Sequence, residues 1–190
     1  MSEANLKTLI AYGTRFGATA GTAEEIAKLL HEEGFEVKVA NLKGQEIQGI
    51  SEYNLVIVGS GMKMGHWTSE AEDFLKKFQY QLNDKKLALF ASTMKAAAER
   101  EGKVEQVAKT HKVALEDKVA KYSLKPITLG FFGGVLDYNK MGFFERKAMG
   151  LYKSQLEKDG FNESEPGVYD MRNWDEIRNW TRELAQKARE

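Results

Sequence analysis

A short loop of glycine and threonine follows the first apolar run of the chain. Thr14, Gly17 and Thr19 stand between an apolar run over residues 7–12 and a helical apolar pattern that begins at residue 19. A loop that opens directly into a helix presents unpaired backbone N–H groups and the positive end of the helix dipole. Such an end binds phosphate, and the threonine hydroxyls add donors. The sequence therefore predicts an anion site here, although any strand–loop–helix corner of an α/β protein can carry glycine and threonine.

Residue types and spacing exclude several other kinds of site. The loop lacks the lysine before serine or threonine that a P-loop has, and it lacks Gly-x-Gly-x-x-Gly. The absence of cysteine excludes disulfides, thiolate nucleophiles, iron–sulfur ligation and cysteine-based zinc sites. His31, His66 and His111 stand far apart in different elements, so no metal site is predicted. No Gly-x-Ser-x-Gly motif occurs and no catalytic residue is assigned, so any redox chemistry must come from a bound cofactor.

Apolar patterning predicts the elements that position this loop. Strands are expected over residues 7–12, 36–40, 55–58, 87–91 and 127–132. Helices are expected from Thr19, from residue 69, over residues 96–121 with a break near Gly102, over residues 141–156, and from Asn173 onwards. This alternation predicts an α/β protein, a three-layer sandwich whose five-stranded parallel sheet is covered on both faces. The run 36–40 alternates like an edge strand, which favours the strand order 2-1-3-4-5.

Three helices carry more detailed expectations. Ser69-Glu70-Ala71-Glu72 is typical of a capping box. One face of the helix over residues 96–121 is expected to carry Val104, Val107, Ala108, His111 and Leu115. Asn173 is expected to cap the last helix, whose inner side would bury Ile177, Trp180, Leu184 and Ala188.

Ligands of such sheets bind beyond the carboxyl ends of the strands. Four loops fall at those ends, at residues 13–19, 59–67, 92–95 and 133–138. The second of them supplies three glycines for close backbone approach, with Met62, Met64 and Trp67 as apolar walls. Trp67 could equally anchor the core at the start of the next helix, and Tyr138 could be a wall or simply cover the end of the sheet.

Length and composition predict one globular domain over residues 1–190, because only 2 prolines and no low-complexity run interrupt it. The 28 basic and 28 acidic residues balance, which argues against nucleic acid as a partner. No apolar stretch reaches the roughly 18 residues that cross a bilayer, and residues 1–5 are polar. We therefore expect a soluble, cytoplasmic protein, with at most peripheral membrane contact through the basic, aromatic stretch 141–147.

Four segments resemble one known family. They are Thr14-Arg15-Phe16-Gly17-Ala18-Thr19, Gly59-Ser60-Gly61-Met62-Lys63-Met64-Gly65-His66-Trp67, Gly133-Gly134-Val135-Leu136-Asp137-Tyr138 and Tyr169-Asp170-Met171-Arg172-Asn173-Trp174. On these segments the chain resembles the flavodoxin superfamily, and more narrowly the branch that includes menaquinone-dependent protoporphyrinogen dehydrogenases and flavodoxin-domain proteins of anaerobes. The resemblance implies a flavodoxin-like fold and noncovalently bound FMN.

The resemblance also implies which residues bind the cofactor. The phosphate would lie on Thr14, Arg15, Phe16, Gly17, Ala18 and Thr19. The rest of the flavin would lie beside Ser60, Gly61, Met62, Lys63, Met64, Gly65, His66, Trp67, Ser92, Thr93, Met94, Lys95, Gly134, Asp137 and Tyr138. Arg15, Lys63 and Lys95 would stabilise a reduced flavin, or would be solvated loop cations. Asp137 could cap Asn139 or contact the ribityl hydroxyls, and His66 could hydrogen-bond the cofactor or face solvent.

Two functions fit this resemblance. The first is an electron carrier that exchanges electrons with a ferredoxin-like protein or a reductase, in keeping with the small size of the chain and the lack of an identifiable catalytic base. The second is a dehydrogenase that passes electrons from protoporphyrinogen to a quinone. Residues 96–125 fill the place of the long segment of these dehydrogenases, and the loop 92–95 lacks the aromatic residue and acids common in carriers. The phosphate loop disfavours a third function, a cofactor-free interaction domain.

Overall fold

The computed structural model describes residues 6–190 and has a five-stranded parallel sheet of order β2-β1-β3-β4-β5. The strands are β1 (Lys7–Gly13), β2 (Glu36–Asn41), β3 (Leu55–Gly61), β4 (Lys86–Thr93) and β5 (Thr128–Gly133). The predicted strand order is confirmed. The prediction for residues 1–5 lies outside the described residues.

The register of the sheet brings the strand ends together. Gly13 pairs with Ser60 across β1 and β3, Gly61 pairs with Ser92 across β3 and β4, and Thr93 pairs with Gly133 across β4 and β5. The loops that follow these strands therefore leave the sheet side by side, at the edge where ligands of doubly wound sheets bind.

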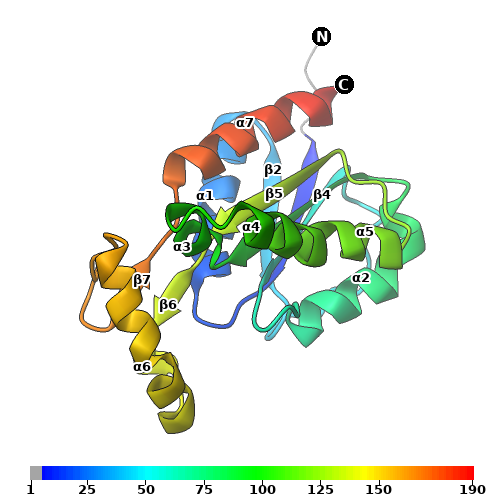
Figure 1. The fold of residues 1–190 in the computed structure, drawn as a ribbon. Coiled ribbons are helices and arrows are strands. Elements are labelled where there is room, and N and C mark those ends of the chain that lie inside the picture. Colours follow the sequence, from blue (N-terminus) through cyan, green and yellow to red (C-terminus); the bar gives the residue numbers. More distant parts are fainter. Residues whose placement is uncertain (1–5) are drawn as a thin grey trace.

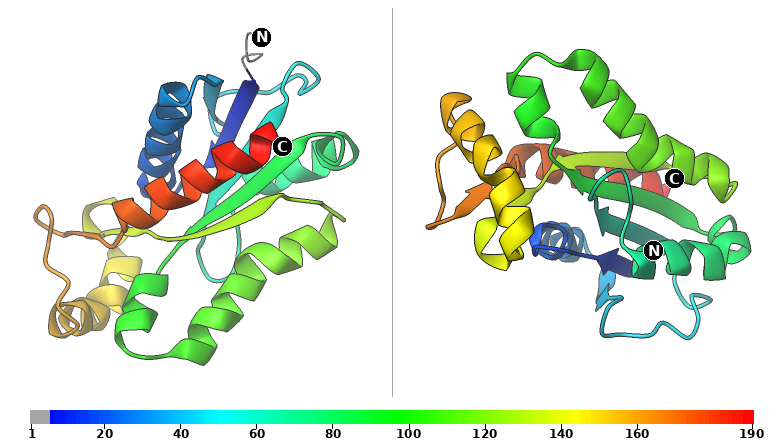
Figure 2. Two further views of the ribbon diagram at one scale, coloured as in Figure 1. Left: turned by 90° about the horizontal axis from the view of Figure 1, so that it is seen from above. Right: turned by 60° about the horizontal axis from the view of Figure 1, so that its bottom comes forward.

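Helices cover both faces of the sheet, which confirms the predicted three layers (Figures 1 and 2). The helices α1 (Ala18–Glu32) and α7 (Trp174–Arg189) cover one face. The other face carries α2 (Ser69–Leu82) and a long insert between β4 and β5, which contains α3 (Lys95–Arg100), α4 (Val104–His111), the π-helical segment η1 (Lys112–Glu116) and α5 (Asp117–Lys121). Apolar side chains from both helical layers pack against the buried strands, and this burial is the main favourable term in folding.

Local sequence signals fix the ends and inner faces of α1 and α7. Ala23, Ile26, Ala27 and Leu30 of α1 are buried at the predicted helical spacing. The predicted inner side of α7 is buried as well, at Ile177, Trp180, Leu184 and Ala188. The Asn173 side chain accepts hydrogen bonds from the N–H groups of Asp175 and Glu176, both at 3.1 Å, so the predicted cap is confirmed.

Three details of the other layer differ from the predictions. The cap of α2 is Thr68, whose hydroxyl accepts from the N–H of Ala71, so the predicted capping box began one residue late. Residues 92–95 form no separate loop, because β4 runs to Thr93 and α3 begins at Lys95. The helix does break at Gly102, at φ +68°, but Val104 is 76% exposed whereas Leu115 is fully buried. The π-helical segment lies between them and shifts the helical phase, so the predicted face is not continuous.

A small extension projects from the sheet beside β5 (Figure 1). The predicted loop 133–138 contains the strand β6 (Val135–Asp137), which pairs antiparallel with β7 (Val168–Asp170). The 3₁₀ turn η2 (Tyr138–Lys140) and the helix α6 (Phe143–Lys158) connect them. This extension has a core of its own, formed by Leu136, Tyr138, Met141, Leu156, Phe161, Tyr169 and Met171 together with Ala97 of α3. The partner of β6 follows it by more than 30 residues, which explains why local patterning missed the pair.

Within residues 6–190, no helix is long and apolar enough to cross a membrane. The same residues contain no group of three or more His, Cys, Asp or Glu side chains placed to hold a metal ion.

Candidate functional site

A cavity of about 510 Å³ opens at the carboxyl ends of β1, β3 and β4, next to α6. Most of the predicted cofactor-binding residues lie on its wall. These are Thr14, Arg15, Phe16, Ala18, Thr19, Gly61, Met62, Lys63, Met64, Ser92, Thr93, Met94 and Gly134. The four loops that the sequence places at one edge of the sheet therefore converge on one cavity.

The phosphate loop closes on itself through its first threonine. The Thr14 hydroxyl accepts a hydrogen bond from the N–H of Gly17 at 3.0 Å, and Gly17 has φ +96°, a left-handed conformation that favours glycine. This tight turn sets the start of α1 and brings Ala18 and Thr19 to the wall of the cavity. The positive end of the α1 dipole thus faces a space large enough for a ligand.

Two buried hydroxyls in this cavity lack a hydrogen-bond partner within the described part of the chain. Thr19 is 1% exposed and Ser92 is 4% exposed, and neither Oγ1 of Thr19 nor Oγ of Ser92 is paired. A buried polar atom without a partner costs about 1–3 kcal/mol, so proteins rarely retain one without a use. Both hydroxyls line the space where the resemblance implies FMN, so the residues present fit that group.

Methionines form much of the apolar wall. Met62, Met64, Met94, Met141 and Met149 all line the cavity. The two aromatic side chains expected as walls do not. Trp67 is 3% exposed in the core under α2, and its Nε1 donates to the carbonyl of Ala114 at 2.8 Å. Tyr138 packs edge-on against Tyr169 in the core of the extension and donates to the carbonyl of Met149 at 2.9 Å. The alternatives left open by the sequence are thereby decided, because both rings serve the core.

Two cations border the cavity. The Nη2 of Arg15 donates to the carbonyl of Trp67 at 3.1 Å, and the Nζ of Lys63 pairs with Glu145 of α6 at 2.7 Å. Lys95, the third predicted cation, lies elsewhere. It is buried at the start of α3 and pairs with Glu176 of α7 at 2.6 Å, so it is neither a solvated side chain nor a residue of the cavity wall.

The remaining predicted residues lie outside the cavity wall. The Ser60 hydroxyl accepts from the N–H of Thr68 at 3.0 Å, and Gly65 turns the chain at φ +81°. His66 is exposed and faces solvent, paired through its backbone with Lys63. The Asp137 carboxylate accepts from the N–H of Asn139 at 3.0 Å, so it acts as a cap, the first of the two roles considered for it.

Sequence reasoning missed one wall of the cavity. Val135 and Leu136 of β6 and, from the region of α6, Met141, Glu145, Ala148 and Met149 also line it. The last four residues follow helical spacing, at i, i+4, i+7 and i+8, so the expected helix over residues 141–156 held a signal that could have found them.

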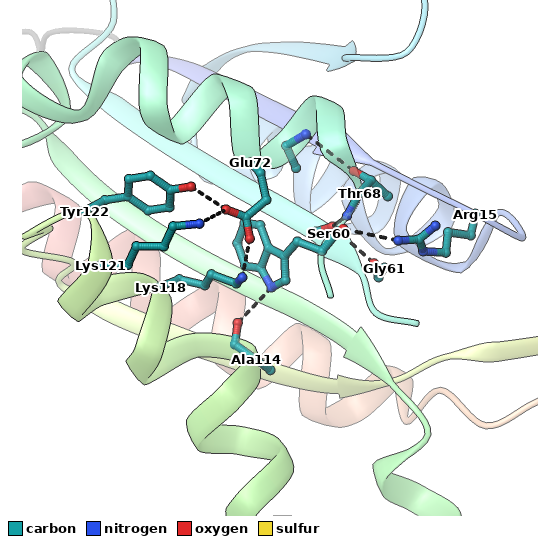
Figure 3. Close-up of polar contacts among 11 residues, drawn as sticks. Arg15, Ser60, Gly61, Thr68, Glu72, Ala114, Lys118, Lys121 and Tyr122 are labelled. Atoms are coloured by element: carbon teal, nitrogen blue, oxygen red, sulfur yellow. Dashed lines mark hydrogen bonds and ion pairs between the residues drawn. The ribbon is translucent and has the colours of Figure 1, made fainter. Parts of the chain in front are cut away.

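A partly buried cluster of charges fastens the helical insert to α2 (Figure 3). Glu72 of α2 contacts Lys118, Lys121 and Tyr122, with its Oε2 3.0 Å from the Nζ of Lys121. Burial alone would raise the pKa of Glu72, but the hydrogen bonds from Lys118, Tyr122 and Lys121 outweigh it and lower the pKa to about 2. The carboxylate is thus held in its charged form.

This cluster predicts an acid-sensitive part of the stability. Because the folded-state pKa of Glu72 lies below the ordinary value of 4.5, the cluster stabilises the protein above pH 4.5, and this contribution is lost as the pH falls toward 2. The Glu72 side chain is 21% exposed, so after solvent screening we expect a loss of about 1–2 kcal/mol. Urea unfolding of wild type and Glu72→Gln at several pH values between about 5 and 2.5 measures it.

The wild type should lose more stability than Glu72→Gln over this pH range. Asp73→Asn is the matched control, because Asp73 is the next acid on α2 and is exposed, and it should follow the wild type. Equal slopes for wild type and Glu72→Gln would show that the cluster contributes nothing measurable.

Both the sequence and the fold are similar to those of known proteins. The family model described as Flavodoxin domain matches residues 9–162. The protoporphyrinogen IX dehydrogenase [quinone] of Escherichia coli (strain K12) is 24% identical over 180 residues, which cover 95% of each chain.

Two solved structures show the same fold. Oxidised flavodoxin 2 from Bacillus cereus has a TM-score of 0.51 at 19% identity and covers 80% of this chain and 98% of its own. Oxidised flavodoxin 1 from the same organism has a TM-score of 0.50 at 16% identity and covers 80% of this chain and 97% of its own. By the family match across most of its length, the chain belongs to the flavodoxin-domain family.

Proposed function

We propose that this protein binds FMN in the cavity next to α6 and passes electrons between redox partners. The observation that carries the proposal is the pair of unpartnered buried hydroxyls, Thr19 and Ser92, inside a cavity that begins at a phosphate-type loop. Membership of the flavodoxin-domain family supports both the cofactor and the electron-transfer role.

Different residues on the cavity wall would contact different parts of the cofactor. Thr14, Thr19 and the N-terminal end of α1 would hold the phosphate, and the methionines would flank the flavin ring and exclude water from it. Bound FMN supplies reversible one- or two-electron redox chemistry. Arg15 places positive charge beside the cavity, which favours electrons on the cofactor and raises its reduction potential, whereas the charge of Lys63 is compensated by Glu145.

The partner on the carrier proposal is a redox protein, either a ferredoxin-like protein or a reductase. Met64 at the mouth of the cavity is 89% exposed, and Phe143 at the start of α6 is 77% exposed. Met64 gives a docked partner an apolar contact at the cavity itself, and Phe143 adds exposed apolar surface at the start of α6.

A second candidate function is quinone-linked oxidation of protoporphyrinogen. The relative from Escherichia coli, which bears the name of that activity, aligns over 95% of both chains. The wall that α6 adds to the cavity also favours this candidate, because it brings a carboxylate, Glu145, next to the apolar space. An oxidation that removes hydrogen requires a proton acceptor, and Glu145 is the acid among the lining residues that the structure describes.

An anaerobic reductive titration of the purified protein tests the proposal. We expect the purified protein to have the absorbance spectrum of a flavin. Denaturation should release this cofactor as intact FMN, because it is bound noncovalently. Reduction in two resolved one-electron steps favours the carrier. Reduction in a single two-electron step, together with porphyrin formation from protoporphyrinogen and added quinone, favours the dehydrogenase. Protein that does not bind FMN when reconstituted would overturn both.

A further inference from the structure

We propose that Trp67 is a positioning residue, which holds the Arg15 guanidinium toward the cofactor phosphate and is itself held by the π-helical segment η1. This inference rests on the proposed FMN site. It assigns a function to the buried tryptophan of the loop 59–67 and to the helical insert between β4 and β5.

The first contact in this chain of hydrogen bonds joins the insert to the loop (Figure 3). The Nε1 of Trp67 donates to the carbonyl of Ala114 at 2.8 Å, and both residues are buried. Ala114 belongs to η1. A π-helical turn is rare, occurs mostly as a single turn within an α-helix, and is frequent at functional sites. An indole ring has a single N–H donor, so its hydrogen bond to this carbonyl fixes the orientation of the whole ring.

The second contact joins Trp67 to the cavity (Figure 3). The carbonyl of Trp67 accepts from the Nη2 of Arg15 at 3.1 Å, and Arg15 lines the cavity beside the phosphate loop. Among the residues that the structure describes, Arg15 is paired with no carboxylate. Its positive charge is therefore not neutralised by the protein and remains free to act on an anion, while one of its five N–H donors is fixed to a backbone carbonyl.

A second attachment keeps the insert in place. Glu72 lies on α2, five residues after Trp67, and contacts Lys118, Lys121 and Tyr122 at the far side of η1. The start of α2 is thus tied to the insert at two points, one on each side of the cap residue Thr68. With both points fixed, a shift of the backbone at Trp67 strains the buried hydrogen bond to Ala114 and the partly buried contacts of Glu72.

The effect of Trp67 should be confined to the anionic end of the ligand. The guanidinium of Arg15 binds phosphate through its charge and through oriented N–H groups. If its orientation is no longer fixed, the contact with the phosphate becomes weaker. Riboflavin carries the same ring and ribityl chain without the phosphate. A general loosening of the fold would weaken both ligands, whereas a loss of Arg15 orientation would weaken FMN alone.

The test compares dissociation constants of FMN and riboflavin for the apoprotein. Trp67→Phe keeps an aromatic ring in the core but removes the N–H together with part of the ring volume, a volume loss that the control below shares. We expect it to weaken FMN binding by about tenfold, the loss of one oriented charge-assisted contact, and riboflavin binding by less than about twofold. Trp180→Phe is the matched control, because Trp180 is also buried but its Nε1 has no partner within the described residues. It should leave both constants unchanged.

Arg15→Gln is a second variant that tests the inference even if Trp67→Phe does not fold. It should also weaken FMN relative to riboflavin by about tenfold, and Trp67→Phe should add no further loss in that background. Equal weakening of both ligands by Trp67→Phe, additive losses in the double variant, or an unchanged preference in Arg15→Gln would overturn the inference. Wild-type protein that binds riboflavin but not FMN, or neither, would instead overturn the proposed phosphate site itself.

Discussion

Replacing Thr19 by valine should lower FMN affinity by about 10- to 100-fold, the equivalent of one hydrogen bond to a charged group. Thr19 is 1% exposed and its hydroxyl has no partner within the described residues, so valine keeps the shape and removes the donor. The same change should raise the free energy of unfolding of the apoprotein by about 1 kcal/mol, because it removes an unpaired buried polar atom. Titration with FMN and urea unfolding of the apoprotein measure the two effects.

Opposite signs for binding and stability distinguish this site from an ordinary buried threonine. Thr22→Val is the control, because Thr22 is fully buried on the same helix and its hydroxyl donates to the carbonyl of Ala18 at 3.1 Å. Thr22→Val should leave FMN affinity unchanged and should not gain stability. If Thr19→Val binds FMN as tightly as the wild type, the phosphate does not lie on the first turn of α1.

A large loss of stability is expected from a substitution at Gly133, the last residue of β5. A Cβ at Gly133 would lie 2.0 Å from the carbonyl oxygen of Met171 and 3.3 Å from the nitrogen of Arg172, both backbone atoms. Gly133→Ala should therefore destabilise the protein by about 3 kcal/mol or more, because the clash is relieved only by separating β5 from the segment that leads into α7. Thermal or urea unfolding measures the loss.

Gly133→Ala should also weaken FMN binding. The N–H of Met171 donates to the carbonyl of Gly134 at 2.9 Å, and Gly134 lines the cavity, so a displaced Met171 alters the wall. Gly150→Ala in α6 is the control, since nothing lies within 4 Å of the added methyl group. It should gain about 0.5–1 kcal/mol from higher helix propensity. Equal stability for Gly133→Ala and wild type would show that the close approach at Met171 is absent.

The elements of the sheet were predictable because their signals are local. The buried run 55–58 and the helical spacing of Ile26, Ala27 and Leu30 each specify one element within a few residues. The strand order followed from right-handed crossovers and the half-exposed pattern of β2. The β6–β7 pair could not be predicted in this way, because each strand is short and α6 lies between the two strands in the sequence.

The features of the candidate site also fall into those that local sequence predicts and those that depend on the tertiary structure. The sequence by itself determined the three-layer fold, the loop from Thr14 to Thr19 and its position at the carboxyl edge of the sheet, because periodicity and loop composition act over a few residues. Only the tertiary structure decided what walls the cavity. Trp67 and Tyr138 donate instead to the carbonyls of Ala114 and Met149 in the core, and methionines from the segments after β3 and β4 and from the region of α6 line the cavity. A buried donor goes to whichever acceptor the fold brings within reach, and that choice depends on residues far away in the chain.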